Sequence, residues 1–187
     1  MNKQLICAVL ASLAVFSVSG AADEGKMDLG KVNPENGQPQ GWVLNAVKLS
    51  RTPDPVPPVA AVKKDADGTA YLHLAGGNTT INHFYLPDFF PAAGGRTSIE
   101  FTFDVRPLTG GGIACGAYLF SGKKWLRTAF ANKWGLKKGE WQKVTVSMPI
   151  QAEFRGSPVD CVRPLLLCGQ KEKVDFRNIA WKIVPSK

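Results

Sequence analysis

Apolar and polar side chains alternate along several segments of the chain. In residues 97–106 every second position is apolar, namely Ile99, Phe101, Phe103 and Val105. Residues 141–148 repeat the pattern. A period of two is typical of a β-strand that turns one face to a core. Weaker runs predict further strands at 41–49, 59–63, 69–74, 80–86, 113–120, 124–131 and 162–168.

The last predicted strand, residues 174–184, carries a shift of phase. Its apolar positions before Arg177 and those after Asn178 are separated by an odd number of residues. Strict alternation would therefore send the two sets to opposite faces. We expect a β-bulge near Arg177 and Asn178 that turns both sets toward the core.

Turn signals rich in glycine separate these segments, and no segment shows a sustained helical period. Short strands between such turns indicate an all-β fold, an antiparallel β-sandwich or jelly roll with few or no helices. The proline-rich segment 53–58 is expected to be an extended surface loop. Without an internal repeat or a linker, residues 23–187 are predicted to form one domain.

The first 22 residues have the layout of a secretory signal peptide. A short positive start precedes an apolar run at 5–18, and small residues follow, with cleavage expected after Ala21 or Ala22. The run is shorter than the roughly 20 residues that span a membrane, so no transmembrane segment is expected. We therefore expect a secreted or periplasmic protein, of bacterial type.

The 187-residue chain is basic, with 23 Lys and Arg against 15 Asp and Glu. Without Lys3 of the signal peptide the balance is 22 against 15, or +7. Such a charge attracts polyanions, which outside the cell means acidic glycans or anionic surfaces rather than nucleic acid. The alternative interpretation is that the charge only keeps the protein soluble.

Three cysteines follow the signal peptide: Cys115, Cys161 and Cys168. On one strand, Cys161 and Cys168 would lie more than about 20 Å apart, beyond bridging range. A disulfide within the chain would therefore use Cys115. Three buried free thiols are the alternative.

The order of several motifs resembles the galactose-binding-like jelly rolls, which include families of carbohydrate-binding modules. The segments that carry the resemblance are NPENG at 33–37 followed by PQGW at 39–42, the strand at 95–106, KGEWQKVTV at 138–146, RPLLL at 163–167 and VDFRNI at 174–179. Together they span most of the chain after residue 29. The resemblance implies a sandwich of two antiparallel sheets and a carbohydrate ligand.

The same resemblance implies a structural calcium ion. The glutamate of the family motif falls on Glu35, but its aspartate in the final strand falls at Arg177, a cation that cannot replace a carboxylate ligand. Asp175 or Asn178 would have to compensate. Glu35 and Asp175 are therefore the expected ligands of a calcium site whose integrity Arg177 puts in question.

Residues 121–141 combine aromatic and basic side chains. A sugar needs a flat apolar surface for its C–H face and polar groups for its hydroxyls. Trp125 and Trp134 lie beside turn residues and are the predicted stacking platforms, with Arg127 and Asn132 as hydroxyl partners. The alternative is that both are ordinary buried or rim tryptophans. The neighbouring lysines would also suit an acidic sugar, or are simply solvated.

The other aromatic side chains favour structural interpretations. The remaining tryptophans, Trp42, Trp141 and Trp181, are expected in the core. A second group, Tyr85 with Phe89 and Phe90 between prolines, is expected to plug one end of the sandwich rather than to bind a ligand.

Nothing in the sequence marks an enzyme. The chain has two histidines, His73 and His83, outside any metal-ligand spacing, and it lacks a nucleophile elbow and a phosphate loop. The favoured hypothesis is an exported, non-catalytic carbohydrate-binding protein. The alternative hypothesis is a cell-envelope protein–protein interaction or scaffold module on the same fold.

Overall fold

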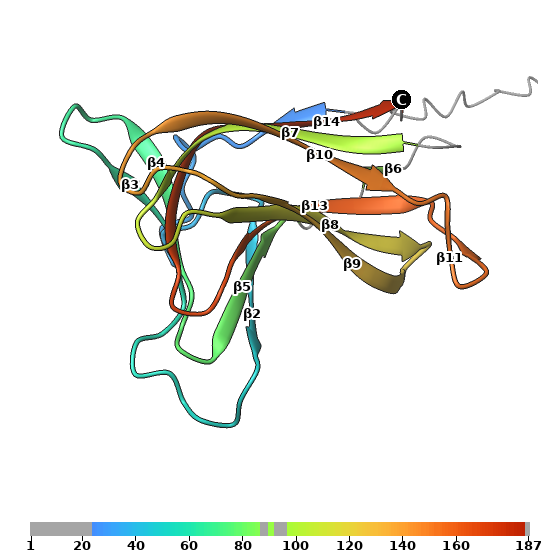
Figure 1. The fold of residues 1–187 in the computed structure, drawn as a ribbon, viewed down its shortest axis with the longest axis horizontal. Helices are drawn as coiled ribbons and strands as arrows, with labels where there is room; N and C mark the ends of the chain where they lie inside the picture. Colours follow the sequence, from blue (N-terminus) through green and yellow to red (C-terminus); the bar gives the residue numbers. More distant parts are fainter. Residues whose placement is uncertain (1–23, 87–89, 92–96, 186–187) are drawn as a thin grey trace, which may run out of the picture.

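The structure is a computed structural model that describes residues 24–86, 90–91 and 97–185. Within these residues every strand pair is antiparallel, and no helix is found that could cross a membrane. Two six-stranded sheets lie as two layers (Figure 1). The predicted all-β sandwich is therefore confirmed. The predicted signal peptide, residues 1–22, lies outside the described residues.

The first layer, termed sheet one, has the strand order β10, β7, β14, β4, β3, and the short β1 pairs with the second half of β14. Its strands are β1 (Glu24–Lys26), β3 (Val59–Lys64), β4 (Ala70–Ala75), β7 (Thr97–Pro107), β10 (Gln142–Ile150) and β14 (Lys173–Pro185).

The second layer, termed sheet two, has the order β2, β5, β13, β8, β9, with β6 also on β13. Its strands are β2 (Val43–Lys48), β5 (Thr80–Tyr85), β6 (Phe90–Pro91), β8 (Ile113–Ser121), β9 (Lys124–Lys133) and β13 (Cys161–Cys168). A small hairpin of β11 (Glu153–Phe154) and β12 (Ser157–Pro158) stands apart from both sheets.

All strands predicted from the sequence are present, with ends shifted by at most two residues. The expected bulge is present too, because the pairing of β14 with β7 shifts between Arg177 and Ala180. At the bulge Asn178 takes a positive φ of 53°. As a result Phe176 before the bulge and Ile179 after it are both almost completely buried.

The core between the sheets contains two of the three tryptophans that were expected there. Trp42 stacks on Phe84 at 5.4 Å between ring centroids and meets Trp181 edge-on at 5.5 Å. The expectation for Trp141 is wrong. Trp141 is half-buried and lies outside the core. The guanidinium groups of Arg106 and Arg177 stand over its ring, 4.5 Å and 4.3 Å from the ring centroid.

All three cysteines in the described part of the chain are free thiols. The sequence left open a disulfide through Cys115 or three free thiols. Among the described residues the structure contains the free thiols and no disulfide through Cys115. Burial raises the pKa of Cys115 and of Cys168 to about 12, so both remain protonated and unreactive. Cys161 is only half-buried, unlike the other two.

Candidate functional site

The side of sheet two that faces away from the core carries a group of aromatic rings. On β8, Tyr118 lies opposite Thr128 of β9 and Arg163 of β13, so these side chains share one face. The group, called the aromatic face below, consists of Tyr85, Tyr118, Phe120, Trp125 and Phe130. It differs from a plain solvent-exposed face, in which polar residues would alternate with the core positions.

Three of these rings, Tyr85, Tyr118 and Phe120, pack on one another in a second apolar cluster outside the main core. Tyr118, Phe120 and Leu165 are its buried members. Tyr85 meets Tyr118 edge-on with ring centroids 5.1 Å apart, and Tyr118 meets Phe120 at 6.5 Å. Edge-to-face contacts of this kind fix ring positions beyond what burial alone does. The face is therefore a preformed surface.

A hollow of about 470 Å³ opens on the aromatic face. All five main strands of sheet two contribute to its lining. The described residues that line it include neither Asp nor Glu: Asn45, Val47, His83, Tyr118, Phe120, Trp125, Thr128 and Arg163. An apolar hollow with a few convergent polar groups is the usual form of a ligand site. We treat it as the candidate functional site.

Trp125 reaches this hollow because of a β-bulge. The pairing of β8 with β9 shifts so that Leu119 lies opposite Arg127 while Phe120 lies opposite Trp125. The extra residue places Trp125 on the same face as Thr128. The Trp125 side chain is 56% exposed, so its ring is available to a ligand.

Two of the polar side chains of the hollow, Asn45 and His83, contact the hydroxyl of Tyr118. Its hydroxyl oxygen accepts a hydrogen bond from Asn45 Nδ2 at 3.1 Å and lies 2.9 Å from His83 Nδ1. Burial raises the pKa of the Tyr118 hydroxyl and lowers the pKa of the His83 imidazole. At neutral pH the hollow therefore presents an uncharged imidazole and a protonated phenol, both able to hydrogen-bond a ligand.

The half-buried His83 predicts a pH dependence of stability. The unfolded chain takes up the imidazole proton near its ordinary pKa of 6.5, whereas the folded chain does so only at lower pH. The free energy of unfolding should therefore fall as the pH drops below about 6.5. Urea titrations at about pH 7 and about pH 5 should show a smaller fall for His83→Gln than for the wild type. Equal falls in the two proteins would contradict this account.

Of the four residues predicted to bind ligand, two lie on the aromatic side of β9 away from the hollow. Asn132 is opposite Ala114, and Trp134 follows the strand, where its ring packs against the Cα of Gly112. Trp134 is 70% exposed. The two tryptophans are nine positions apart in the sequence, or about 30 Å along a strand. They are therefore separate contact points.

The fourth predicted residue, Arg127, lies on the other side of β9. It is opposite Leu119, and its guanidinium stands 5.1 Å from the ring of Phe154 in the β11–β12 hairpin. The structure thus does not bring Arg127 together with Trp125. The polar residues that it does bring together with Trp125 were not selected from the sequence, namely Asn45, His83, Tyr118, Thr128 and Arg163.

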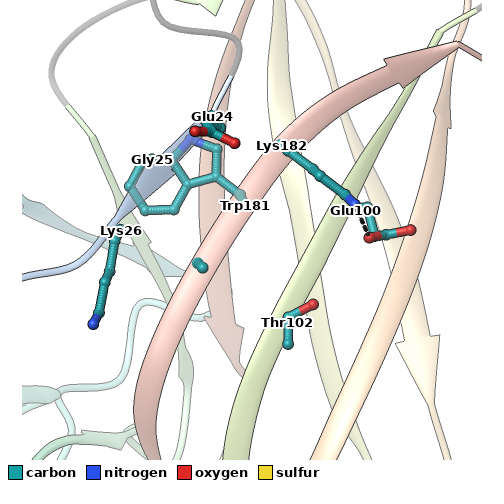
Figure 2. Close-up of a pocket in the computed structure, with 8 residues that line it drawn as sticks. Glu24, Gly25, Lys26, Glu100, Thr102, Trp181 and Lys182 are labelled. Atoms are coloured by element: carbon teal, nitrogen blue, oxygen red, sulfur yellow. Dashed lines mark ion pairs between the residues drawn. The ribbon is translucent and has the colours of Figure 1, made fainter.

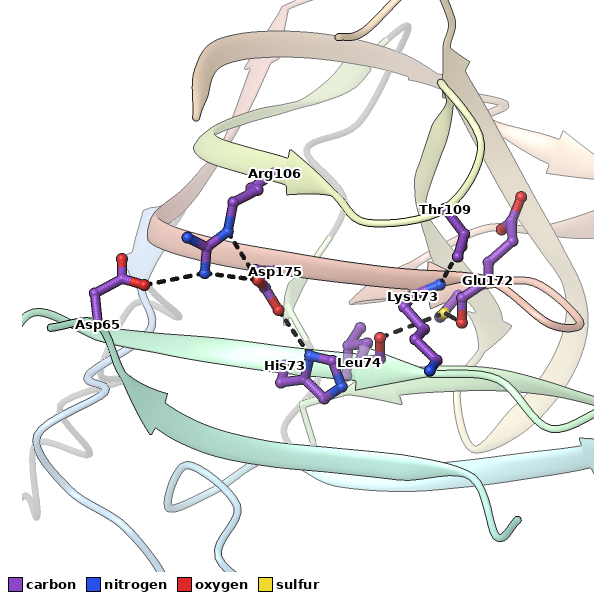
Figure 3. Close-up of polar contacts among 9 residues, drawn as sticks. Asp65, His73, Leu74, Arg106, Thr109, Glu172, Lys173 and Asp175 are labelled. Carbon is purple, nitrogen blue, oxygen red and sulfur yellow. Dashed lines mark hydrogen bonds and ion pairs between the residues drawn. The ribbon is translucent and has the colours of Figure 1, made fainter. Parts of the chain in front are cut away.

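Glu35 and Asp175, the expected calcium ligands, do not fit a calcium ion. Asp175 accepts a hydrogen bond from Arg106 Nε at 2.9 Å and lies 2.7 Å from His73 Nδ1 (Figure 3). Glu35 belongs to an exposed turn. No group of three or more His, Cys, Asp or Glu suited to a metal occurs among the described residues. Calcium requires several oxygen ligands, and here Asp175 faces hydrogen-bond donors instead.

Arg106 and Arg177 form ion pairs on this outer side of sheet one. Arg106 also bonds Asp65 at 3.0 Å, and Arg177 lies 3.5 Å from Asp104 and 3.8 Å from Asp65. Figure 3 shows Arg106 between Asp65 and Asp175. The network links β4, β7 and β14 to the β3–β4 turn, which is a structural role.

A second hollow, of about 460 Å³, lies on the outer side of sheet one beside β1 (Figure 2). Its walls carry charges of both signs, including an ion pair between Lys182 and Glu100 at 2.9 Å. Its one aromatic residue, Trp181, is buried and packs closely against Gly25. Without an exposed ring or an unbalanced charge, this hollow is the weaker candidate.

Comparisons with known proteins find similar folds but no match to the sequence. No protein-family model and no curated protein matches the sequence. Among solved structures, the xylan-binding domain CBM22-1 of Xyn10C from Paenibacillus barcinonensis has a TM-score of 0.48 at 13% identity, and the alignment covers 90% of this chain and 99% of that one. Further similar structures include carbohydrate-binding modules of families 11 and 29. This chain is similar to β-sandwich carbohydrate-binding modules.

Enzymes are among the similar structures as well. A cyclase from Fischerella sp. TAU has a TM-score of 0.49 at 14% identity and covers 90% of this chain and 96% of its own. The active domain of tailspike protein 4 from bacteriophage CBA120 has a TM-score of 0.49 at 8% identity; 78% of this chain matches 20% of that chain. Because one fold hosts many functions, the function has to come from the residues of this chain.

Proposed function

We propose that this chain is an exported, non-catalytic carbohydrate-binding protein that holds glycan on the aromatic face of sheet two. One observation carries the proposal: the exposed ring of Trp125 stands at a hollow that also presents hydrogen-bonding side chains. A pyranose ring has an apolar C–H face and a rim of hydroxyls, and such a site matches both.

Each part of the hollow has a role in this proposal. Trp125 stacks on a sugar ring, while Tyr118 and Phe120 form the floor. Asn45 and Thr128 hydrogen-bond the sugar hydroxyls. Farther along the same side of β9, Trp134 and Asn132 contact the remainder of a longer glycan.

The proposal places the protein outside the cytoplasm. Residues 1–22 have the features of a signal peptide, so the protein would be secreted or periplasmic in a bacterium. Glycan polymers are accessible ligands in those compartments.

A glycan-array screen of the mature protein, from Asp23 onward, tests the proposal at low and at physiological salt. We expect binding to a defined set of glycans that persists at physiological salt, because stacking and hydrogen bonds are screened little. Binding only to polyanions in general, lost with salt, would reduce the site to a basic surface. No binding to any glycan would contradict the proposal and favour a protein partner.

A further inference from the structure

We propose that His83 is a positioning residue of the glycan site: acting through the Tyr118 hydroxyl, it holds the Asn45 amide in the orientation that binds sugar hydroxyls. Only the neutral imidazole can do this, so the affinity for glycan should fall in mild acid. This inference rests on the proposed function and adds to it a positioning residue and a dependence on pH.

The Tyr118 side chain reaches across β13 to the two strands beyond it. Tyr118 belongs to β8, whereas His83 on β5 and Asn45 on β2 lie directly opposite each other. The Tyr118 hydroxyl oxygen stands 2.9 Å from His83 Nδ1 and 3.1 Å from Asn45 Nδ2. All three side chains line the hollow. They therefore form one chain of hydrogen bonds at the site.

The direction of each hydrogen bond follows from counting donors and acceptors. A phenol hydroxyl has one proton and two lone pairs, and Asn45 Nδ2 can only donate. Tyr118 is buried, and a buried hydroxyl needs an acceptor for its own proton. The acceptor that the geometry offers is Nδ1 of a neutral His83, whose ring proton is then on Nε2. Asn45 thus donates to Tyr118, and Tyr118 donates to His83.

This order fixes which atoms of the Asn45 amide face a ligand. One N–H is used on Tyr118, which leaves the carbonyl oxygen Oδ1 and the second N–H for a sugar. An acceptor and a donor side by side can hydrogen-bond two adjacent hydroxyls of a pyranose ring. An amide that is already held in place also loses less conformational entropy when the sugar binds.

Protonation of His83 removes the acceptor at the end of this chain. An imidazolium donates from both nitrogens, so Nδ1 would then donate to the Tyr118 oxygen. The Tyr118 proton must turn away from His83, and the Asn45 N–H loses its fixed acceptor. A sugar placed over the hollow would also remove water from a charged ring, which costs free energy. Both effects weaken binding.

His83 is the group of the hollow that changes charge in mild acid. Its ring stands 5.7 Å from that of Phe130, and burial lowers the pKa of the imidazole below its ordinary value of 6.5. The other titratable or charged groups near it on this face, among the described residues, are Tyr118 of β8, Tyr85 of β5 and Arg163 of β13. Arginine stays charged throughout, and burial raises the pKa of the Tyr118 hydroxyl.

The sign of the pH dependence follows from proton linkage. Glycan binding favours the neutral His83, so the bound protein holds fewer protons than the free protein at any pH where His83 titrates. The affinity should therefore be constant above about pH 6.5 and should fall as the pH drops through the lowered pKa of His83.

Isothermal titration of the mature protein at about pH 7.5 and about pH 5 tests the inference. The probes are β-1,4-linked hexasaccharides of glucose, xylose and mannose, together with any oligosaccharide retained on the glycan array. We expect the wild type to bind about tenfold more weakly at the lower pH, the effect of one lost hydrogen bond. His83→Asn keeps an acceptor near the position of Nδ1 that cannot be protonated, so its affinity should be close to wild-type and equal at both pH values. His83→Phe keeps a ring without an acceptor and should bind weakly at both.

NMR of the free protein adds a readout that needs no ligand. The side-chain amide signals of Asn45 should shift with the titration of His83 in the wild type and stay constant in Tyr118→Phe, which lacks the connecting hydroxyl. Amide signals that ignore the His83 titration, equal wild-type affinity at both pH values, or a pH dependence that survives in His83→Asn would overturn the positioning role, although glycan binding itself would stand. Failure of every probe and of the array would overturn both proposals.

Discussion

Replacing Trp125 by alanine is expected to weaken glycan binding by about 30-fold, because a central aromatic anchor typically contributes about 2 kcal/mol or more to binding. The ring is 56% exposed, so its loss removes few internal contacts. The free energy of unfolding should therefore change by less than about 1 kcal/mol. Isothermal titration with a glycan found on the array, combined with urea denaturation, measures both quantities.

Trp134→Ala is the matched control for this variant. Trp134 is also exposed and follows the end of β9, but it lies outside the hollow. A short oligosaccharide should bind Trp134→Ala as well as it binds the wild type. Unchanged affinity in Trp125→Ala would show that glycan binds elsewhere, and a large loss of stability would show that Trp125 is a structural residue.

The largest loss of stability is expected from Asp175→Ala. The carboxylate is 2% exposed and is shared by Arg106 and His73 on the outer side of sheet one. Removing it leaves the Arg106 charge partly buried without its main partner, and breaking a buried pair in this way typically costs about 3 kcal/mol. The melting temperature should fall by about 6–12 °C. Calorimetry measures this fall, and a chelator added to the wild type should leave its melting temperature unchanged.

Two further variants define the origin of that loss. Glu100→Gln breaks the exposed pair with Lys182 and should cost less than about 1 kcal/mol. Combining Asp175→Leu with Arg106→Met removes both charges and should recover much of the stability lost in Asp175→Ala. A chelator that lowers the melting temperature, or an Asp175→Ala protein as stable as the wild type, would contradict this view of the network.

The fold could be predicted because the strands of this chain alternate cleanly. In residues 97–106 each apolar side chain that alternation assigns to the core is almost fully buried. The shift of phase in β14 was also visible, since apolar residues on both sides of a bulge must reach the same core. The four strands that were missed, β1, β6, β11 and β12, have only two or three residues and no readable period.

The site could be predicted only in part, and the bulge in β9 is one reason. Regular alternation would put Trp125 and Arg127 on one face, and the sequence contains no signal for the extra residue. Trp125 now shares a face with Thr128, while Arg127 points to the other side. Because a shift of one residue exchanges the faces of a strand, the predicted pair was separated.

The other residues of the hollow lie on strands that were predicted, but only the order of the strands shows that these residues come together. His83, Tyr118 and Arg163 each occupy the non-core phase of a predicted strand, where aromatic and polar residues replace the usual solvated ones. Only the order β5, β13, β8 places these three strands side by side. Tyr85, which the sequence analysis assigned to a group that plugs one end of the sandwich, belongs to this group as well, because its ring contacts that of Tyr118. Phe89 lies outside the described residues.

The most direct test of the account is an NMR titration of ¹⁵N-labelled mature protein with a glycan identified on the array. Binding on the aromatic face predicts that amide shifts concentrate in β2, β5, β8, β9 and β13, together with the Trp125 indole N–H. Shifts concentrated instead in β1, β7 and β14, around the hollow of sheet one, would contradict the account.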